Sequence, residues 1–321
     1  MMAQRPPLTA LVQGSDGKFY GTTSGGFGTV FQITTDRALT ILYAFQGGND
    51  GAGPSGLAQG SDGDFYGTTS AGGTNNVGTV FQTSTNGGLT SLHSFTGIDG
   101  EQPSAALLRS SDGDFYGTTS GGGAHANQFG QGGTVFQIST NAVFTSLYSF
   151  TGGDDGYGPN GLAQGSDGSF YGTTFSGGSN SVGTVFEINT NGQLTTLYAF
   201  GTVTNASGGA LDGANPQAAL VQGSDGNFYV TTAYDGVGYA GTVFRLAMVP
   251  EFQPLTLTNG RLSLSWSTEA GGVYQLQYNS DLSSGNWVNL GSAATASGTT
   301  LSTTDSITNG PQRFYRLLLA P

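Results

Sequence analysis

The chain has 321 residues, of which 57 are glycine and only 9% are charged. Its 20 Phe and 14 Tyr supply the bulky apolar side chains that disordered chains lack, and the glycines show no three-residue period. Disorder and a collagen-like structure are therefore excluded. No apolar run approaches the roughly 18 residues that a membrane span needs. The net charge of −12 argues against nucleic acid and anionic membranes as partners.

The residue counts also exclude several chemistries. Without cysteine there can be no thiol catalysis, disulfide framework or thiolate metal site. The two histidines are too few for a three-histidine zinc site, and Lys18 is the sole lysine on which a Schiff base could form. The 20 acidic residues are what remains for catalysis.

A self-similar segment recurs five times. Its first landmark, Asp-Gly-x-Phe-Tyr-Gly-Thr-Thr with Val for the second Gly in the fifth copy, returns about every 50 residues, as in propeller repeats. The motif Gly-Thr-Val-Phe follows in all five copies. The motifs Leu-Thr-x-Leu-Tyr-x-Phe and Asp-Gly-x-x-Pro follow, with small variations, after the first four.

We expect four short strands in each repeat and name them A to D. Strand A ends in Leu-Val-Gln or a variant, B is Phe-Tyr-Gly-Thr-Thr, C begins at Gly-Thr-Val-Phe, and D is Leu-Thr-x-Leu-Tyr-x-Phe. The Asp-Gly pair between A and B is a strong hairpin signal. Adjacent apolar residues in B, C and D indicate burial on both faces. The pattern predicts a five-bladed β-propeller of four-stranded repeats, with a β-solenoid as the competing fold.

The repeat pattern stops near Pro250. The segments 255–258, 261–267, 273–278, 287–290, 299–304 and 313–319 alternate like antiparallel strands, and Asn259-Gly260 reads as a hairpin turn. We therefore expect an all-β protein with a propeller at 1–250 and a small β-sandwich at 251–321. The fifth repeat lacks an evident strand D, so Leu255 begins either that strand or the sandwich.

The repeat resembles that of the GloVer-type (choice-of-anchor) tandem-repeat proteins, over roughly residues 11–246. The resemblance implies an extracellular or cell-surface location and no particular biochemical activity. The segments 274–278, 281–287 and 313–317 are similar to the fibronectin-III-like modules that end many secreted bacterial proteins. No sorting anchor follows Leu319, in contrast to anchored members, and no signal peptide is visible at the N-terminus.

The connections between B and C and between D and the next A vary in length, whereas the Ser-Asp-Gly turn between A and B hardly changes. In a propeller the two variable connections share one face, which predicts a binding face. One acid per repeat falls in the D–A connections, and these acids could hold Ca²⁺, catalyse glycoside cleavage, or simply form loops. Our candidate ligand-binding residues are Asp155, Tyr157, His125, Asp50, Asp99, Asp212, Tyr234 and Asp235.

Aromatic side chains on the variable connections could stack on sugars or could plug the loops. They are Phe27, Phe129, Tyr157, Phe175, Tyr234 and Tyr239. His93 stands where three other repeats have Tyr in strand D, so we expect a packing role for it, whereas His125 lies in the longest B–C loop. Trp287 is the second candidate for sugar stacking, and Trp266 is expected in the core of the sandwich.

These observations predict a secreted or cell-surface binding or scaffold module that recognises a glycan on the variable face. The alternatives are a carboxylate-dependent glycan hydrolase or lyase, and a purely structural surface-display protein. No cofactor is expected, although the acids could suit Ca²⁺. The expected partner is a glycan or another extracellular ligand, not nucleic acid.

Overall fold

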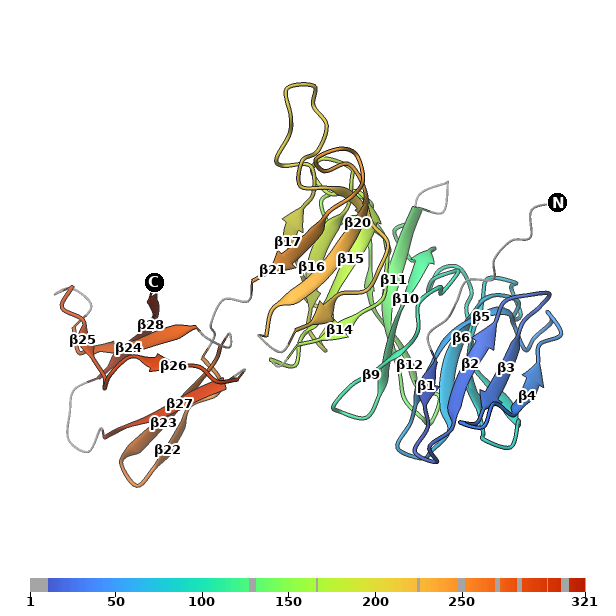
Figure 1. Cartoon of the computed structure of the whole chain (residues 1–321), viewed down its shortest axis with the longest axis horizontal. Coiled ribbons are helices and arrows are strands. Elements are labelled where there is room, and N and C mark those ends of the chain that lie inside the picture. Colours follow the sequence, from blue (N-terminus) through green and yellow to red (C-terminus); the bar gives the residue numbers. More distant parts are fainter. Residues whose placement is uncertain are drawn as a thin grey trace. The chain divides into compact units, whose positions relative to one another are not determined.

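The computed structural model contains only strands, turns and irregular segments in the residues that it describes (Figure 1). The described part of the chain holds no helix that is long and apolar enough to cross a membrane. The described residues are 11–126, 131–165, 167–223, 226–247, 252–268, 272–281, 285–298, 300–306 and 312–320.

Each of the first four repeats forms an antiparallel sheet in which strands A, B, C and D pair in chain order. In the first repeat these strands are β1 (Val12–Gln13), β2 (Phe19–Thr23), β3 (Thr29–Ile33) and β4 (Leu39–Ala44). In the second they are β5 (Ala52–Gln59), β6 (Phe65–Ala71), β7 (Thr79–Thr83) and β8 (Leu89–Ser94). The third repeat has β9 (Leu108–Arg109), β10 (Phe115–Gly121), β11 (Gln131–Ile138) and β12 (Phe144–Ser149). The fourth has β13 (Tyr157–Pro159), β14 (Ala163–Gln164), β15 (Phe170–Ser176), β16 (Thr184–Ile188) and β17 (Leu194–Ala199).

One feature of strand A was not predicted. The end of the Asp-Gly-x-x-Pro segment, which we had expected to be a loop, pairs with the end of strand B, as Pro159 of β13 does with Thr174 of β15. In the second repeat the same segment is the first half of β5, where Pro54 pairs with Thr69. Strand A is therefore longer than the Leu-Ala-Gln motif, with a break in register in its middle.

In the second, third and fourth repeats strands B and C are buried on both faces, as expected. Strand C is mostly half-buried in the first repeat, and in the fifth repeat, at Val243–Leu246, it is half-buried or exposed. In β10 the run from Phe115 to Thr119 is almost inaccessible, and Val135 and Phe136 of β11 are fully buried. The glycine of strand B makes room for the phenylalanine of strand C, because a Cβ on Gly117 would lie 2.4 Å from Phe136 Cζ. Strand D departs from the prediction. As the outer strand of each sheet it is largely exposed or half-buried, as in β4 and β12.

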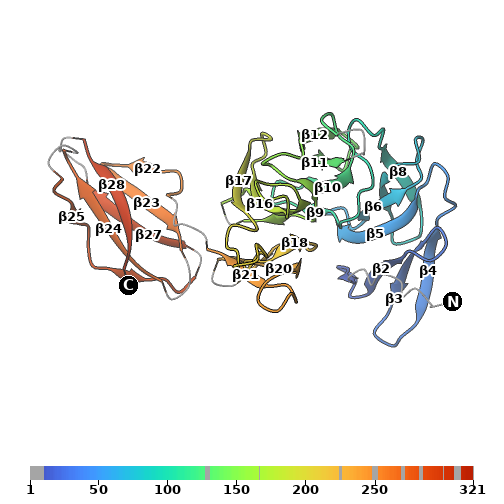
Figure 2. The same cartoon turned by 90° about the horizontal axis from the view of Figure 1, so that it is seen from above.

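Successive repeats are joined by stacked aromatic rings. The tyrosine of strand B in one repeat stacks on the phenylalanine of strand B in the next, with ring centroids 4.0 to 4.2 Å apart. These pairs are Tyr20–Phe65, Tyr66–Phe115 and Tyr116–Phe170. Figure 2 shows the four sheets following one another in chain order. Closure of five repeats into one ring stays a prediction, because the described contacts join each repeat to its neighbour in the chain.

The fifth repeat has no strand D among the described residues. Its sheet contains β18 (Ala214–Pro216), β19 (Val221–Gln222), β20 (Phe228–Tyr234) and β21 (Val243–Leu246). The segment after Leu255 forms β22 (Thr256–Thr258), which pairs with β23 (Arg261–Ser267). The residues that follow Leu255 therefore begin the C-terminal sheets and do not complete the fifth repeat.

The C-terminal residues form two antiparallel sheets. The first contains β22, β23 and β27 (Thr300–Ser306), and the second contains β24 (Val273–Asn279), β25 (Val288–Asn289), β26 (Ala294–Thr295) and β28 (Phe314–Ala320). Trp266 and Leu264 of β23 share a buried core with Tyr274 and Leu276 of β24. The predicted turn is present, since Asn259 and Gly260 both have positive φ. The fibronectin-III-like sandwich itself stays a prediction.

Contacts between Cα atoms divide the chain into two compact units. The first comprises residues 1–164, 168–220 and 230–243, and the second comprises 165–167, 221–229 and 244–321. The boundary expected from the sequence, between residues 250 and 251, stays a prediction.

Candidate functional site

The two variable connections meet at one end of each sheet, as predicted. In the third repeat the backbone N–H of Gly123, in the B–C loop, donates to the carbonyl of Gly97 in the D–A loop at 2.7 Å. The same bond joins Gly73 to Gly48 and Gly178 to Gly153. The Ser-Asp-Gly turn precedes strand B, whereas the B–C loop follows it, so the turn lies at the opposite end of the sheet.

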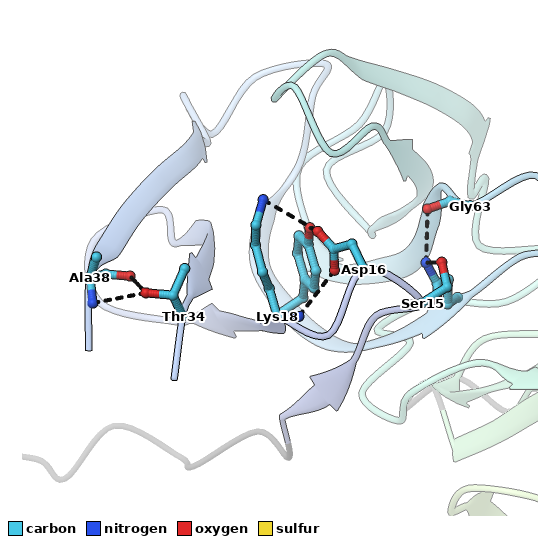
Figure 3. A network of polar contacts seen from close by, with 8 residues as sticks. Ser15, Asp16, Lys18, Thr34, Ala38 and Gly63 are labelled. Atoms are coloured by element: carbon cyan, nitrogen blue, oxygen red, sulfur yellow. Dashed lines mark hydrogen bonds and ion pairs between the residues drawn. The ribbon is translucent and has the colours of Figure 1, made fainter. Parts of the chain in front are cut away.

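The aspartates of the first three Ser-Asp-Gly turns, Asp16, Asp62 and Asp112, have a structural role, which Figure 3 shows for the first repeat. Asp16 Oδ1 accepts the backbone N–H of Lys18 at 3.1 Å, and Oδ2 accepts the hydroxyl of Tyr20 at 2.8 Å. Lys18 Nζ lies 3.3 Å from Asp16 Oδ2. Burial and the hydrogen bond to Asp16 raise the pKa of Tyr20 to about 12. The sole lysine is thus part of a turn.

The D–A acids also organise their own loops. Asp50 Oδ2 accepts the Tyr43 hydroxyl at 3.1 Å and the backbone N–H of Gln46 at 2.7 Å. Asp155 accepts the Tyr148 hydroxyl at 3.1 Å and both the backbone N–H and the hydroxyl of Thr151, at 2.7 and 2.5 Å. Each carboxylate therefore ties the tyrosine of strand D to the loop that follows it.

Asp99 and Asp212 repeat this arrangement. Asp99 accepts the backbone N–H and the hydroxyl of Thr96, and its Oδ2 lies 2.9 Å from Nε2 of His93. His93 thus takes the place of the strand D tyrosine, as the sequence predicts. Asp212 accepts the Tyr198 hydroxyl at 2.6 Å. Burial acts to raise the pKa of Asp212, but this and other hydrogen bonds outweigh it, and the net pKa is lowered.

The four carboxylates therefore accept hydrogen bonds from the loops that carry them. A glycosidase of the common type needs two carboxyl groups that flank the bond to be cleaved. In the part of the chain that the structure describes, no group of three His, Asp or Glu side chains could hold a metal ion. The D–A acids therefore fit the loop-forming alternative better than the catalytic one.

The structure places the predicted site residues Tyr157 and His125 on different elements, and their joint role in binding stays a prediction. Tyr157 is half-buried and begins β13, where it pairs with Ser176. His125 is exposed, and its backbone N–H donates to the hydroxyl of Ser149 at 3.2 Å. Phe129 lies outside the described residues.

The B–C loop of the fifth repeat has the same backbone as those of the second and fourth. The N–H of Gly241 donates to the carbonyl of Asp235 at 2.8 Å, as Gly78 does to Gly72 and Gly183 to Gly177. Asp235 therefore stands where the other two loops have glycine. Aligned on this hydrogen bond, Tyr239 corresponds to Asn76 of the second repeat and Ser181 of the fourth.

Both positions lie in the left-handed region of the backbone. The φ angle is 60° at Asp235 and 59° at Tyr239. A positive φ is unusual for residues other than glycine, and it is least expected for a bulky side chain such as tyrosine. Backbone strain of this kind concentrates at functional sites. The fifth repeat thus has Asp235 where the second and fourth repeats have glycine, and a bulky tyrosine where they have Asn76 and Ser181.

These side chains are available to a ligand. Tyr234 and Tyr239 are 56% and 69% exposed, and Asp235 is half-buried. Among the residues that the structure describes, the Asp235 carboxylate has no hydrogen-bond or ion-pair partner, in contrast to Asp50, Asp99, Asp155 and Asp212. We define the repeat-five loop as residues 234–241. Tyr234 and Asp235 of this loop are among the candidate ligand-binding residues predicted from the sequence, whereas Tyr239 was predicted only as an aromatic residue on a variable connection.

The tryptophans of the C-terminal sheets are less accessible. Trp266 is 3% exposed and lies in the core, as predicted. Trp287 is half-buried, and the guanidinium carbon of Arg316 lies 4.4 Å from the centroid of its ring. Because this cation covers the ring, Trp287 offers a poorer stacking surface than the tyrosines of the repeat-five loop.

Comparison with protein families identifies the repeats. A model of the Gloeobacter/Verrucomicrobia repeat matches residues 3–161 and again residues 126–278. The chain belongs to this family. The two matches together span all five copies of the repeat, which confirms the tandem-repeat assignment made from the sequence. No curated protein matches the chain.

Several solved structures are similar at low identity. A gluconolactonase from Xanthomonas campestris is 15% identical, with 80% of this chain and 82% of that chain covered and a TM-score of 0.46. A putative 6-phosphogluconolactonase from Bacteroides uniformis is 14% identical, with 92% and 87% covered and a TM-score of 0.41. A GH43 β-xylosidase/α-arabinofuranosidase from a compost metagenome is 11% identical, with 81% and 93% covered and a TM-score of 0.42.

Proposed function

We propose that this protein is a secreted or cell-surface binding module, without catalytic activity, that recognises a glycan through the repeat-five loop. The observation that carries the proposal is the pair of exposed rings Tyr234 and Tyr239 beside the half-buried Asp235, whose carboxylate has no hydrogen-bond partner among the described residues. Aromatic rings offer apolar faces to the C–H side of a sugar, and a carboxylate accepts its hydroxyls.

The engagement of the D–A acids favours binding over the hydrolase or lyase alternative. Asp235 is a single free carboxylate, and a second one within about 5–10 Å would be needed for glycoside cleavage. Because the carboxylates of these acids already accept hydrogen bonds within their loops, they give no support to a Ca²⁺ site. The acids are Asp50, Asp99, Asp155 and Asp212. We therefore propose that binding does not depend on a metal, and that a chelator leaves it unchanged.

The test replaces two residues of the repeat-five loop by those of the B–C loop in the second repeat. The double variant Asp235→Gly/Tyr239→Asn gives the repeat-five loop the residues that the second repeat has at Gly72 and Asn76. On an array of immobilised glycans, the wild type should bind at least one glycan, and the double variant should bind it at least about fivefold more weakly. Ser181→Asn, at the matching exposed position of the fourth repeat, is the control and should bind like the wild type.

Two results would contradict the proposal. Unchanged binding in the double variant would place the site elsewhere, with the His125 loop and Tyr157 as the next candidates. The absence of binding to every glycan on the array would favour the purely structural, surface-display alternative.

A further inference from the structure

A pocket lies along the A segments of the third, fourth and fifth repeats, apart from the repeat-five loop. Its volume is about 360 Å³, which is within the range of small-molecule sites. Ser104, Asn160 and Gln217 supply polar groups to its wall, and Ala106, Leu162 and Ala219 supply apolar surface. No acidic or basic side chain lines it.

The amide of Asn160 is held in one orientation. Its Nδ2 donates one hydrogen to Thr173 Oγ1 at 2.9 Å and the other to the carbonyl of Pro216 at 2.8 Å. Because a carbonyl oxygen can only accept, the atom facing Pro216 must be the nitrogen. Both hydrogens are therefore used, while Oδ1 has no donor in the described part of the chain. A fixed acceptor is thus left at the wall of the pocket.

Asn160 also links the fourth repeat to the fifth, and a comparison with the second repeat shows whether that link needs an asparagine. The residue after the proline of each A segment is polar, and in the second repeat it is Ser55. The Ser55 hydroxyl donates to the carbonyl of Pro103 in the next repeat, just as Asn160 donates to that of Pro216. Serine can make the link between repeats, as Ser55 does at 3.4 Å, although Ser104 at the same place in the third repeat has no partner among the described residues. The link alone therefore does not require asparagine in the fourth repeat.

The remaining polar groups fit the same kind of ligand. Gln217 and Ser104 are exposed, and neither side chain has a hydrogen-bond partner among the described residues. A wall with one fixed acceptor, an adaptable amide, a hydroxyl and several alanine and leucine surfaces complements a neutral molecule that has both hydroxyl groups and an apolar face. The absence of charged lining residues disfavours ionic ligands.

We infer that this pocket is a second binding site, which takes a small neutral sugar, with Asn160 Oδ1 accepting a sugar hydroxyl. The site is independent of the repeat-five loop. It holds a single sugar unit, whether that unit is free or ends a longer chain.

The experiment uses the full chain and five neutral sugars as probes: glucose, galactose, mannose, xylose and N-acetylglucosamine. Binding is measured by saturation-transfer NMR and by calorimetric titration. At least one of the sugars should bind the wild type. Asn160→Ser, which keeps a donor of the kind that Ser55 uses, should weaken that binding about tenfold. Gln217→Ala, a change at an exposed side chain, should weaken it about threefold or more.

The controls separate this inference from the proposed function. The double variant Asp235→Gly/Tyr239→Asn should bind the sugar in the pocket like the wild type, even where it has lost binding on the glycan array. Thermal melts of Asn160→Ser and Gln217→Ala check that the fold is kept. Failure of all five sugars to bind the wild type would overturn the inference. Unchanged affinity in both Asn160→Ser and Gln217→Ala would overturn it as well.

Discussion

The imidazole ring of His93 lies parallel to the ring of Phe144, with the two centroids 3.7 Å apart and the planes 5° from each other. His93 belongs to strand D of the second repeat and Phe144 to strand D of the third. In the neighbouring junctions the equivalent residues are Tyr43 with Leu89, and Tyr148 with Leu194. The second junction has thus exchanged a Tyr–Leu pair for a His–Phe pair.

We expect the two members of this exchanged pair to be coupled. His93→Tyr alone would crowd Phe144, and Phe144→Leu alone would remove the stacked ring, so each single change should destabilise the fold by about 1–2 kcal/mol. The double variant rebuilds the Tyr–Leu pair of the other junctions. Urea unfolding of all four proteins should give a coupling energy of about 0.5–1.5 kcal/mol. Additive effects, within about 0.5 kcal/mol, would contradict a direct interaction.

Alkaline pH should destabilise the repeats. Burial and the neighbouring Asp155 raise the pKa of Tyr148 to about 12 in the fold, compared with 10.0 for an unperturbed tyrosine. The contribution of the neutral Tyr148 hydroxyl to the free energy of unfolding is therefore fully present below about pH 10, and it is lost as the pH rises toward 12. Tyr148→Phe should cost about 1 kcal/mol at neutral pH and should make the fall in melting temperature above pH 10 shallower. An equally steep fall in the variant would rule out a contribution from Tyr148.

Restoring glycine in the repeat-five loop should not destabilise the protein. Asp235 has φ 60°, and the left-handed conformation costs a residue with a Cβ about 1–2 kcal/mol. Glycine avoids that cost but has more conformational freedom to lose on folding, by roughly 0.5–1 kcal/mol. We therefore expect Asp235→Gly to raise the free energy of unfolding by up to about 1 kcal/mol. A clear loss of stability would show that Asp235 holds the loop together, contrary to a role in binding.

The C-terminal sheets should be dispensable for folding of the first four repeats. Strands β22 to β28 pair with one another and share the core around Trp266 and Leu276. A chain that ends at residue 249 should stay in solution and melt cooperatively, with near-native far-UV dichroism. The compact unit that includes these sheets also takes in residues 221–229. Aggregation of the shortened chain would therefore show that the fifth repeat needs the C-terminal sheets.

Much of the fold could be predicted because turns and burial leave strong local signals. The Asp-Gly pairs marked the A–B turns, and the adjacent apolar residues marked B and C as the buried strands that they are in the second, third and fourth repeats. Strand D looked equally apolar, but an outer strand has one neighbour only, and its exposure cannot be read from the composition of the strand. The pairing of Tyr157 with Ser176 was missed because an Asp-Gly-x-x-Pro segment reads locally as a loop.

The candidate site was harder to predict, since sequence position does not show what a carboxylate contacts. Asp155 and Asp235 looked equally available, but the hydrogen bonds from Tyr148 and Thr151 engage Asp155 alone. A signal for Asp235 was nevertheless present in the repeats. Two other B–C loops have glycine at its position, which marks a left-handed backbone conformation that Asp235 must share.

The central claim, binding without turnover, is tested most directly by following one glycan in two ways. A glycan that binds on the array is titrated into the protein, and newly formed reducing ends are then measured in the same sample during prolonged incubation. The account predicts saturable binding and no more reducing ends than in a sample without protein. Formation of reducing ends that depends on the protein and disappears in Asp235→Gly would contradict it, because Asp235 would then be a catalytic acid of a glycan-cleaving enzyme.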